Sequence, residues 1–168
     1  MNLENRLERL LRENKIRLAK KQLIDDLMKY HEIDISEKEF VDFDSSKKEH
    51  KKVYERIRTD KIKFFSFPYD EEKMKAKIDF IFDYFSKYEE KTVMFYPSAF
   101  GFYFKSSNQL YLEYPVAISI PLAECKQMVM KLMVEMHDDL IVISRKYNFG
   151  FVLSENEYSY VSIEYWDH

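Results

Sequence analysis

Two stretches of the chain repeat apolar residues at the helical spacing of three or four positions. In the first stretch, the apolar positions are Met74, Ile78, Ile81, Phe85 and Tyr88. In the second, they are Leu122, Cys125, Met128, Val129, Leu132, Met133 and Met136. This periodicity predicts helices over 71–88 and 121–137, each with an apolar face buried against another layer. Asp70 stands where it can cap the first of them.

The first thirty residues contain neither glycine nor proline and also predict helix. Leu3, Leu7 and Leu10 form an apolar stripe that meets polar residues from Asn14 onward, and a second stripe begins two residues later. This pattern predicts either one helix whose buried face rotates or two helices that meet near Asn14. The break in the stripe argues against a long coiled coil.

Two more helices are expected before residue 60. Ser36 and Glu39 have the spacing of a capping box, which predicts a short helix that begins at Ser36. Residues 47–59 form a charged helix candidate whose apolar side holds Val53 and Ile57.

Strands are predicted where β-branched and aromatic residues cluster between turn signals. They cover residues 62–67, 92–96, 100–104, 110–114, 116–120, 139–144, 149–154 and 158–166. Short connections favour antiparallel pairing of consecutive strands. The prediction is an α+β fold in one domain over 1–168. A helical section over 1–60 precedes an antiparallel sheet of about five to seven strands, which packs with the helices over 71–88 and 121–137.

The only two glycines, Gly101 and Gly150, each lie between two phenylalanines. Both Phe-Gly-Phe tripeptides precede more apolar residues, a polar turn and a strand that ends in Glu-Tyr, which predicts two similar β-hairpins. Within a strand, the phenylalanines point to one face and the glycine to the other. Glycine then marks a bulge, lets another element pack against the backbone, or opens a floor for a ligand. We prefer the first two explanations because strand glycines usually have structural causes.

Composition narrows the classes of protein. The chain of 168 residues is 46% hydrophobic and 17% aromatic, which is ample for a packed core. A single cysteine, Cys125, excludes an intrachain disulfide and favours a reducing compartment. We see neither a signal peptide nor an apolar stretch long enough to span a membrane. These features predict a cytoplasmic protein.

Charge is distributed unevenly along the chain. Residues 1–63 hold 17 Lys and Arg against 14 Asp and Glu, whereas residues 64–168 hold 10 against 16. The acidic second part disfavours nucleic acid as a partner, so the hypothesis of nucleic-acid binding rests on the basic helical region 16–63. Its candidate contacts are Lys47, Lys48, Lys51, Lys52, Arg56 and Arg58. We prefer to interpret them as an ordinary charged helix face.

Catalytic and cofactor-binding motifs are missing from the sequence. It contains no phosphate-binding loop, dinucleotide fingerprint, nucleophile elbow, zinc-protease motif or C-x-x-C pair. His137, Asp138 and Asp139 suggest a metal cluster, but the end of a helix explains them better. We therefore predict no catalytic residue, no metal site and no cofactor. An enzyme with an acidic cleft around Asp138, Asp139 and Glu164 is the least supported alternative.

The last strand predicts a binding surface. Alternation places Val161, Ile163 and Tyr165 on one face and the remaining aromatic and acidic side chains on the other. If helices cover only the first face, the second is an exposed row typical of a protein-binding patch; if they cover both, the row is core. The candidate partner-binding residues are Tyr158, Tyr160, Glu164, Trp166, Glu155, Glu157, Tyr111 and Glu113.

A small α+β protein with an acidic, aromatic surface and no catalytic motif resembles the bacterial immunity proteins, which neutralise a cognate toxin, often a nuclease, by blocking its basic active site. The resemblance is one of general character over the C-terminal hundred residues. It implies a non-enzymatic inhibitor that binds a basic protein such as a cognate toxin. Charge complementarity would speed association, and the Tyr and Trp anchors would supply affinity.

Overall fold

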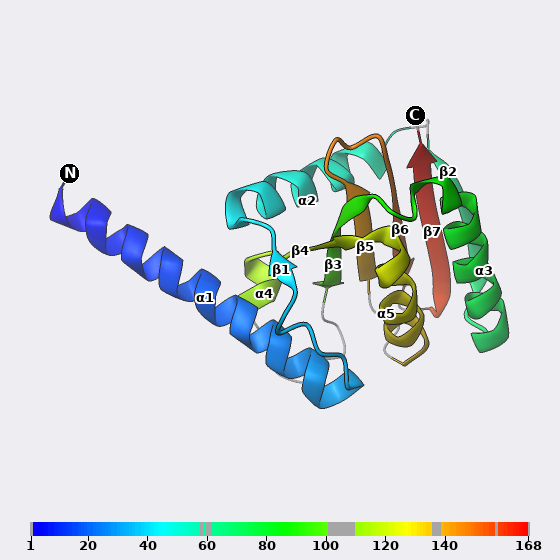
Figure 1. Cartoon of the computed structure of the whole chain (residues 1–168), viewed down its shortest axis with the longest axis horizontal. Helices are drawn as coiled ribbons and strands as arrows, with labels where there is room; N and C mark the ends of the chain where they lie inside the picture. The colour runs from blue at the N-terminus through cyan, green and yellow to red at the C-terminus, as the bar shows by residue number, and fades with distance from the viewer. Residues whose placement is uncertain are drawn as a thin grey trace.

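The computed structural model describes residues 2–57, 59, 62–100, 110–135, 139–156 and 158–167 (Figure 1). The strands are β1 (Glu39–Phe40), β2 (Lys63–Pro68), β3 (Thr92–Phe100), β4 (Ile118–Pro121), β5 (Asp139–Ser144), β6 (Phe149–Glu155) and β7 (Tyr160–Asp167). The helices are α1 (Leu3–His31), α2 (Phe43–Ile57), α3 (Glu71–Tyr84), the 3-10 turn η1 (Ser86–Tyr88), α4 (Leu110–Glu113) and α5 (Leu122–Glu135). The seven strands form one antiparallel sheet in the order β1-β4-β3-β5-β6-β7-β2, which confirms the predicted α+β class.

The larger core lies between one face of the sheet and the helices α3, α5 and the second half of α1. The predicted periodicity of α3 is confirmed, because Met74, Ile78 and Ile81 are all buried. The carboxylate of Asp70 accepts a hydrogen bond from the backbone N–H of Lys73 at 2.8 Å and caps the helix as expected. The predicted apolar repeat continues past the end of α3, because Phe85 and Tyr88 of the following turn also pack in the larger core.

A second core lies under α2 on the opposite face of the sheet. Val53 of α2 packs there with Met94, Ile141 and Trp166 from three strands. The hydroxyl of Tyr96 donates a hydrogen bond of 2.6 Å to a backbone carbonyl of α2 and ties the helix to β3. Helices therefore lie on both faces of the sheet, and the second of the alternatives considered for the last strand holds for the part of β7 that lies under α2.

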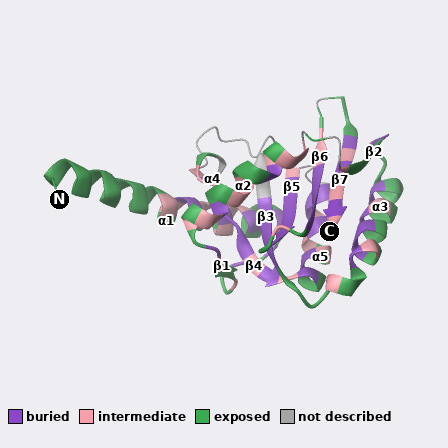
Figure 2. Cartoon of the chain, turned by 90° about the horizontal axis from the view of Figure 1, so that it is seen from above, coloured by how far each residue is buried: buried purple, intermediate pink, exposed green. Residues whose placement is uncertain are grey.

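The first helix is continuous through Asn14, which excludes the second of the two alternatives, two helices that meet there. Its buried residues, Ala19, Leu23, Leu27 and His31, all belong to its second half. The first half extends away from the sheet, and its surface is exposed on all sides (Figures 1 and 2).

Two other predicted elements are wrong. The Oδ1 atom of Asp34 accepts hydrogen bonds from both the backbone N–H (2.9 Å) and the hydroxyl (2.6 Å) of Ser36, which closes a turn before β1 instead of starting a helix. The strand predicted over 110–114 is the short helix α4. The first predicted hairpin is therefore not formed as expected; residues 101–109, including Gly101, lie outside the described residues.

The second predicted hairpin is confirmed as β6 and β7, in which Gly150 pairs with Trp166. Phe149 and Phe151 point into the larger core, where Phe149 stacks on Tyr88 with ring centroids 4.1 Å apart. On the other face, a Cβ atom added to Gly150 would lie 2.7 Å from Cζ2 of Trp166. The explanation of close packing is therefore confirmed for Gly150.

Candidate functional site

The aromatic row predicted on β7 is divided by α2. Trp166 lies beneath this helix and is only 3% exposed. The guanidinium of Arg56 lies 5.3 Å from its ring centroid, and the ring of Tyr147 lies 5.6 Å away. Trp166 is therefore a core residue, and its prediction as a surface anchor is wrong. Arg56 packs on this cluster rather than on the lysine-bearing face of α2, where the nucleic-acid hypothesis had placed it.

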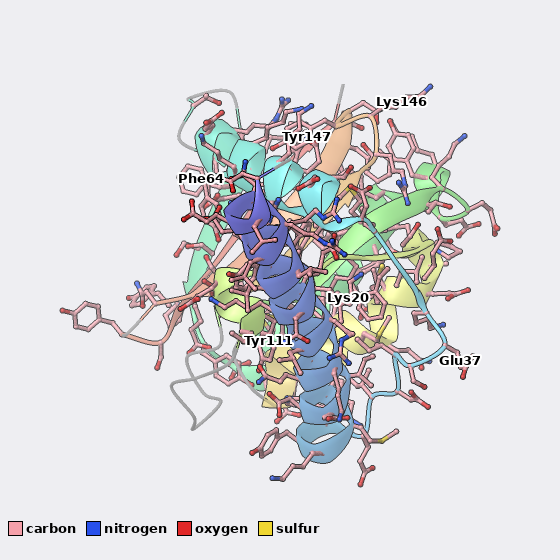
Figure 3. The ribbon with its side chains drawn as sticks, turned by 90° about the vertical axis from the view of Figure 1, so that its left-hand side faces the viewer. Lys20, Glu37, Phe64, Tyr111, Lys146 and Tyr147 are labelled. Carbon is pink, nitrogen blue, oxygen red and sulfur yellow. The ribbon has the colours of Figure 1, made fainter. Side chains whose placement is uncertain are left out.

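Tyr111 is also buried, and its expected place on an exposed strand face is wrong. Its hydroxyl donates a hydrogen bond of 2.8 Å to Oδ2 of Asp26, and the backbone N–H of Leu110 donates one of 2.8 Å to Oε1 of Gln22. Both acceptors belong to α1, so this helix holds α4 in place (Figure 3). Glu113 is exposed, but it lies on α4 and does not extend the row of β7.

The face of the sheet that packs against α2 extends beyond this helix, and there it carries a polar strip that we call the acidic shelf. It is formed by Ser66, Ser162, Ser154, Asp139 and Glu164, all of them exposed or half-buried. The register of β2, β7 and β6 places the three serines side by side. The antiparallel register of β5 with β6 brings Asp139 to the end of this row.

Exposed aromatic side chains border the acidic shelf. Phe64 pairs with Glu164 from the edge strand β2, and its side chain is 71% exposed at the periphery of the molecule (Figure 3). Tyr160 and Tyr158 are exposed at the start of β7 and in the turn before it. The Oδ1 atom of Asn156 accepts the backbone N–H groups of both tyrosines at 3.0 Å and shapes this turn. Tyr158 and Tyr160 of the predicted surface therefore remain accessible, and Phe64 joins them.

The carboxylates of the acidic shelf are partly removed from water. Burial, together with the charges of Glu155 and Glu164, raises the pKa of Asp139 to about 6. The backbone N–H of Glu155 donates a hydrogen bond of 3.2 Å to Oδ1 of Asp139, and this bond lowers the pKa of Asp139. Burial also raises the pKa of Glu164, whose Oε2 atom is shielded from solvent with no hydrogen-bond partner among the described residues. A cation placed here would be attracted more strongly than at a fully solvated surface.

Replacing Asp139 by asparagine should stabilise the protein at neutral pH. The native pKa of Asp139, about 6, lies above its ordinary value, so the unfolded chain releases the proton first as the pH rises. The free energy of unfolding therefore falls between about pH 4 and pH 6 and stays low above this window. Asparagine keeps an acceptor for the Glu155 N–H and removes the charge.

We expect Asp139→Asn to add about 1–2 kcal/mol at pH 7.5 and nothing at pH 3.5. Urea unfolding at the two pH values measures both numbers. A loss of stability at pH 7.5 would show that the charged carboxylate is favoured in the native state, which is the opposite of this expectation.

Four of the six predicted basic candidates lie together on α2. Lys47, Lys48, Lys51 and Lys52 are all exposed on one face of this helix, which we call the lysine strip. Lys52 forms an ion pair of 3.1 Å with Glu49 of the next turn back. Arg58, like Glu157 of the acidic candidates, lies outside the described residues.

An open cavity of about 460 Å³ lies between the lysine strip and α4. It is lined by Lys47, His50, Lys51, Tyr54, Glu55, Glu113 and Pro115. The imidazole of His50 packs on the rings of Tyr54 and Tyr96, with centroids 5.1 and 5.4 Å away. Burial lowers the pKa of His50 to about 4, so this side chain is neutral at physiological pH and adds no charge to the lysine strip.

The described residues contain no group of three or more His, Cys, Asp or Glu side chains arranged to hold a metal ion. Two members of the His137-Asp138-Asp139 run, His137 and Asp138, fall outside them. Cys125 is buried, and burial raises the pKa of its thiol, so it belongs to the unreactive core as predicted. No helix in the described ranges has both the length and the apolar character needed to cross a bilayer.

Comparison of the chain with protein-family models, with curated proteins and with solved structures finds no match in any of the three. The function proposed below therefore rests on the surfaces of this chain alone.

Proposed function

We propose that the chain is a non-enzymatic protein-binding domain of the toxin-neutralising kind, which captures a basic protein partner through the acidic shelf. The observation that supports this most is the pairing of Phe64 with Glu164. A largely exposed aromatic ring lies beside a half-buried carboxylate that has an oxygen without a partner among the described residues. Aromatic anchors next to charges that can be paired are typical of the residues that dominate binding energy.

Each component of the shelf has a role in this proposal. A lysine or arginine of the partner pairs with Glu164 and with Asp139, whose carboxylates are already partly desolvated. The row of serines supplies hydrogen bonds, and Phe64, Tyr158 and Tyr160 supply apolar area at the border. The excess of acidic residues over 64–168 attracts a basic partner from a distance. We place this binding in the cytoplasm, where Cys125 stays reduced.

The double substitution Phe64→Ser and Tyr160→Ser should weaken partner binding by about 100-fold, because two exposed aromatic anchors are removed. The partner is first captured from an extract of the source cells on the immobilised protein and is then purified. Calorimetric titration of that purified partner gives the affinities. Both side chains are exposed, so the urea midpoint should stay within the error of the wild type.

The matched control is Lys48→Ser with Lys51→Ser on the lysine strip, which should leave the affinity unchanged. The reverse result, with affinity lost in the control and unchanged in the shelf variant, would contradict the acidic shelf as the binding surface.

Expression of the purified partner's gene tests the toxin-neutralising role separately. We expect it to arrest growth and co-expression of this chain to restore it; a harmless partner would remove that role.

The lysine strip supports a second candidate function, the binding of nucleic acid. Its four lysines lie together on one exposed helix face, where phosphates can approach them. Gel-shift titration with duplex DNA and with RNA at 50 and 200 mM salt tests it. Salt-sensitive binding that is lost in Lys48→Ser with Lys51→Ser would favour this function over the acidic shelf.

A further inference from the structure

The first half of α1 exposes a row of large apolar side chains. Leu3, Leu7, Leu10 and Leu11 are between 48% and 82% exposed. In Figures 1 and 2 this half of the helix extends away from the sheet. Leucines grouped on one side of a helix are normally buried against another surface.

The projecting half is held in a fixed direction. The guanidinium of Arg12 forms an ion pair of 2.8 Å with Asp44 and lies 5.2 Å from the ring centroid of Phe43. These contacts tie α1 at Arg12 to the start of α2. The segment before Arg12 continues a helix whose second half is packed in the core, so its conformation does not depend on its own weak tendency to fold.

The leucines and the charges beside them form a self-complementary pattern. Leu3, Leu7 and Leu10 are spaced by four and three residues and form a seam along the helix. Arg6 and Glu13 both fall on the same edge of this seam, because they are seven residues apart. When two such helices lie antiparallel with Leu7 of one against Leu10 of the other, Arg6 of each copy comes opposite Glu13 of the other.

We propose that the projecting half of α1 pairs with the same segment of a second copy of the chain to form an antiparallel homodimer. The overlap from Leu3 to Asn14 is roughly 18 Å long at 1.5 Å per residue. Such a contact is small, so dimerisation falls in the micromolar range. The antiparallel arrangement leaves the two sheet domains at opposite ends of the helix pair, with both acidic shelves open.

The charges beside the leucines fit a second copy better than a lipid surface. Residues 3–14 hold three arginines and three glutamates, so the segment carries no net charge. A helix that lies on an anionic membrane carries mainly lysine and arginine on its polar face.

Sedimentation velocity between 5 and 200 µM tests the dimer. We expect the wild-type chain to shift from monomer to dimer over this range, and Leu7→Glu with Leu10→Glu to remain monomeric throughout. Both leucines are exposed, so the urea midpoint of the variant should equal that of the wild type. A wild-type chain that is monomeric at 200 µM, or a variant that still dimerises, overturns the proposal.

A charge exchange tests the orientation. Arg6→Glu places like charges opposite each other twice and should weaken the dimer about tenfold. Arg6→Glu with Glu13→Arg restores both pairs, so we expect recovery of the wild-type affinity. A double variant that dimerises as weakly as the single variant contradicts the antiparallel arrangement.

Cosedimentation with vesicles of phosphatidylglycerol and phosphatidylcholine tests a membrane as the alternative occupant. If the wild-type chain is monomeric in solution but binds the vesicles, and Leu7→Glu with Leu10→Glu does not bind them, the leucines contact membranes and the dimer proposal is overturned.

Discussion

Replacing Trp166 by alanine should destabilise the protein by about 3–5 kcal/mol. The indole is almost fully buried under α2 and fills the space above Gly150 on the neighbouring strand. Its removal leaves a cavity that the glycine cannot fill, and it also removes the ring on which the Arg56 guanidinium packs. Chemical unfolding in urea measures this loss as a fall in the free energy of unfolding.

The matched control for Trp166→Ala is Phe64→Ala, which removes an aromatic ring from the same face of the sheet. Because Phe64 is largely exposed, we expect a change of no more than about 0.5 kcal/mol. The pair of variants separates the core under α2 from the surface of the acidic shelf. Equal losses for both variants would mean that the division of this face into covered and open parts is wrong.

Replacing Gly150 by valine should cost about 2–3 kcal/mol through overpacking. A Cβ atom at this position would lie 2.7 Å from Cζ2 of Trp166, 2.8 Å from the carbonyl oxygen of Val142 and 3.0 Å from Cγ2 of Ile143. The carbonyl belongs to the backbone of the adjacent strand β5, so it cannot move without disturbing the pairing of β5 and β6. Valine adds two methyl groups to an already blocked position.

The cause of the Gly150 effect can be isolated with a double substitution. Trp166→Phe shortens the overlying ring, so Gly150→Val should cost less in that background than in the wild type. Ser154→Ala, on the same strand and the same face, is the control and should be close to neutral. A cost for Gly150→Val that does not change with residue 166 would exclude the indole as the main obstacle.

The fold was predictable where local pattern and tertiary packing agree. The repeat of Met74, Ile78 and Ile81 is strong enough to define α3, and Asp70 marks its start. Alternation along β7 also assigned Val161 and Ile163 correctly to one face, with Trp166 on the other. Alternation alone does not tell which helix covers the second face.

The first hairpin was mispredicted because residues 110–114 are as rich in aromatic and β-prone side chains as a strand. Their helical conformation depends on bonds from Tyr111 and Leu110 to Asp26 and Gln22, more than eighty positions earlier in the chain. No local signal announces such contacts. The helix predicted to begin at Ser36 is absent for a different reason. The Ser36 hydroxyl donates its hydrogen bond to Asp34, two residues earlier, and does not cap a helix that follows.

The acidic shelf was only partly predictable for a related reason. Tyr160 and Glu164 were recognised from their strand, whereas Phe64 was not, because β2 joins the sheet at its far edge, about a hundred residues before its neighbour β7. The sequence nevertheless contained a pattern from which the position of Phe64 could be predicted. Phe65 and Phe67 take the inward face of β2, so alternation alone places Phe64 on the other face.

The stability of the second core and the geometry of the shelf are connected. Trp166 and Glu164 follow each other on the same face of β7, and packing of the indole under α2 fixes the strand from which the carboxylate projects. The raised pKa of Asp139 indicates that this end of the sheet keeps a charge at a cost in stability. Such a cost is common at functional sites.

Hydrogen exchange of the chain with and without its purified partner tests the proposed binding surface most directly. We expect slower exchange in β2 (Lys63–Pro68) and in the turn around Tyr158 when the partner is bound, with no change over residues 47–52 of α2. Protection confined to the lysine strip, with β2 unchanged, would contradict the binding of a basic protein to the acidic shelf.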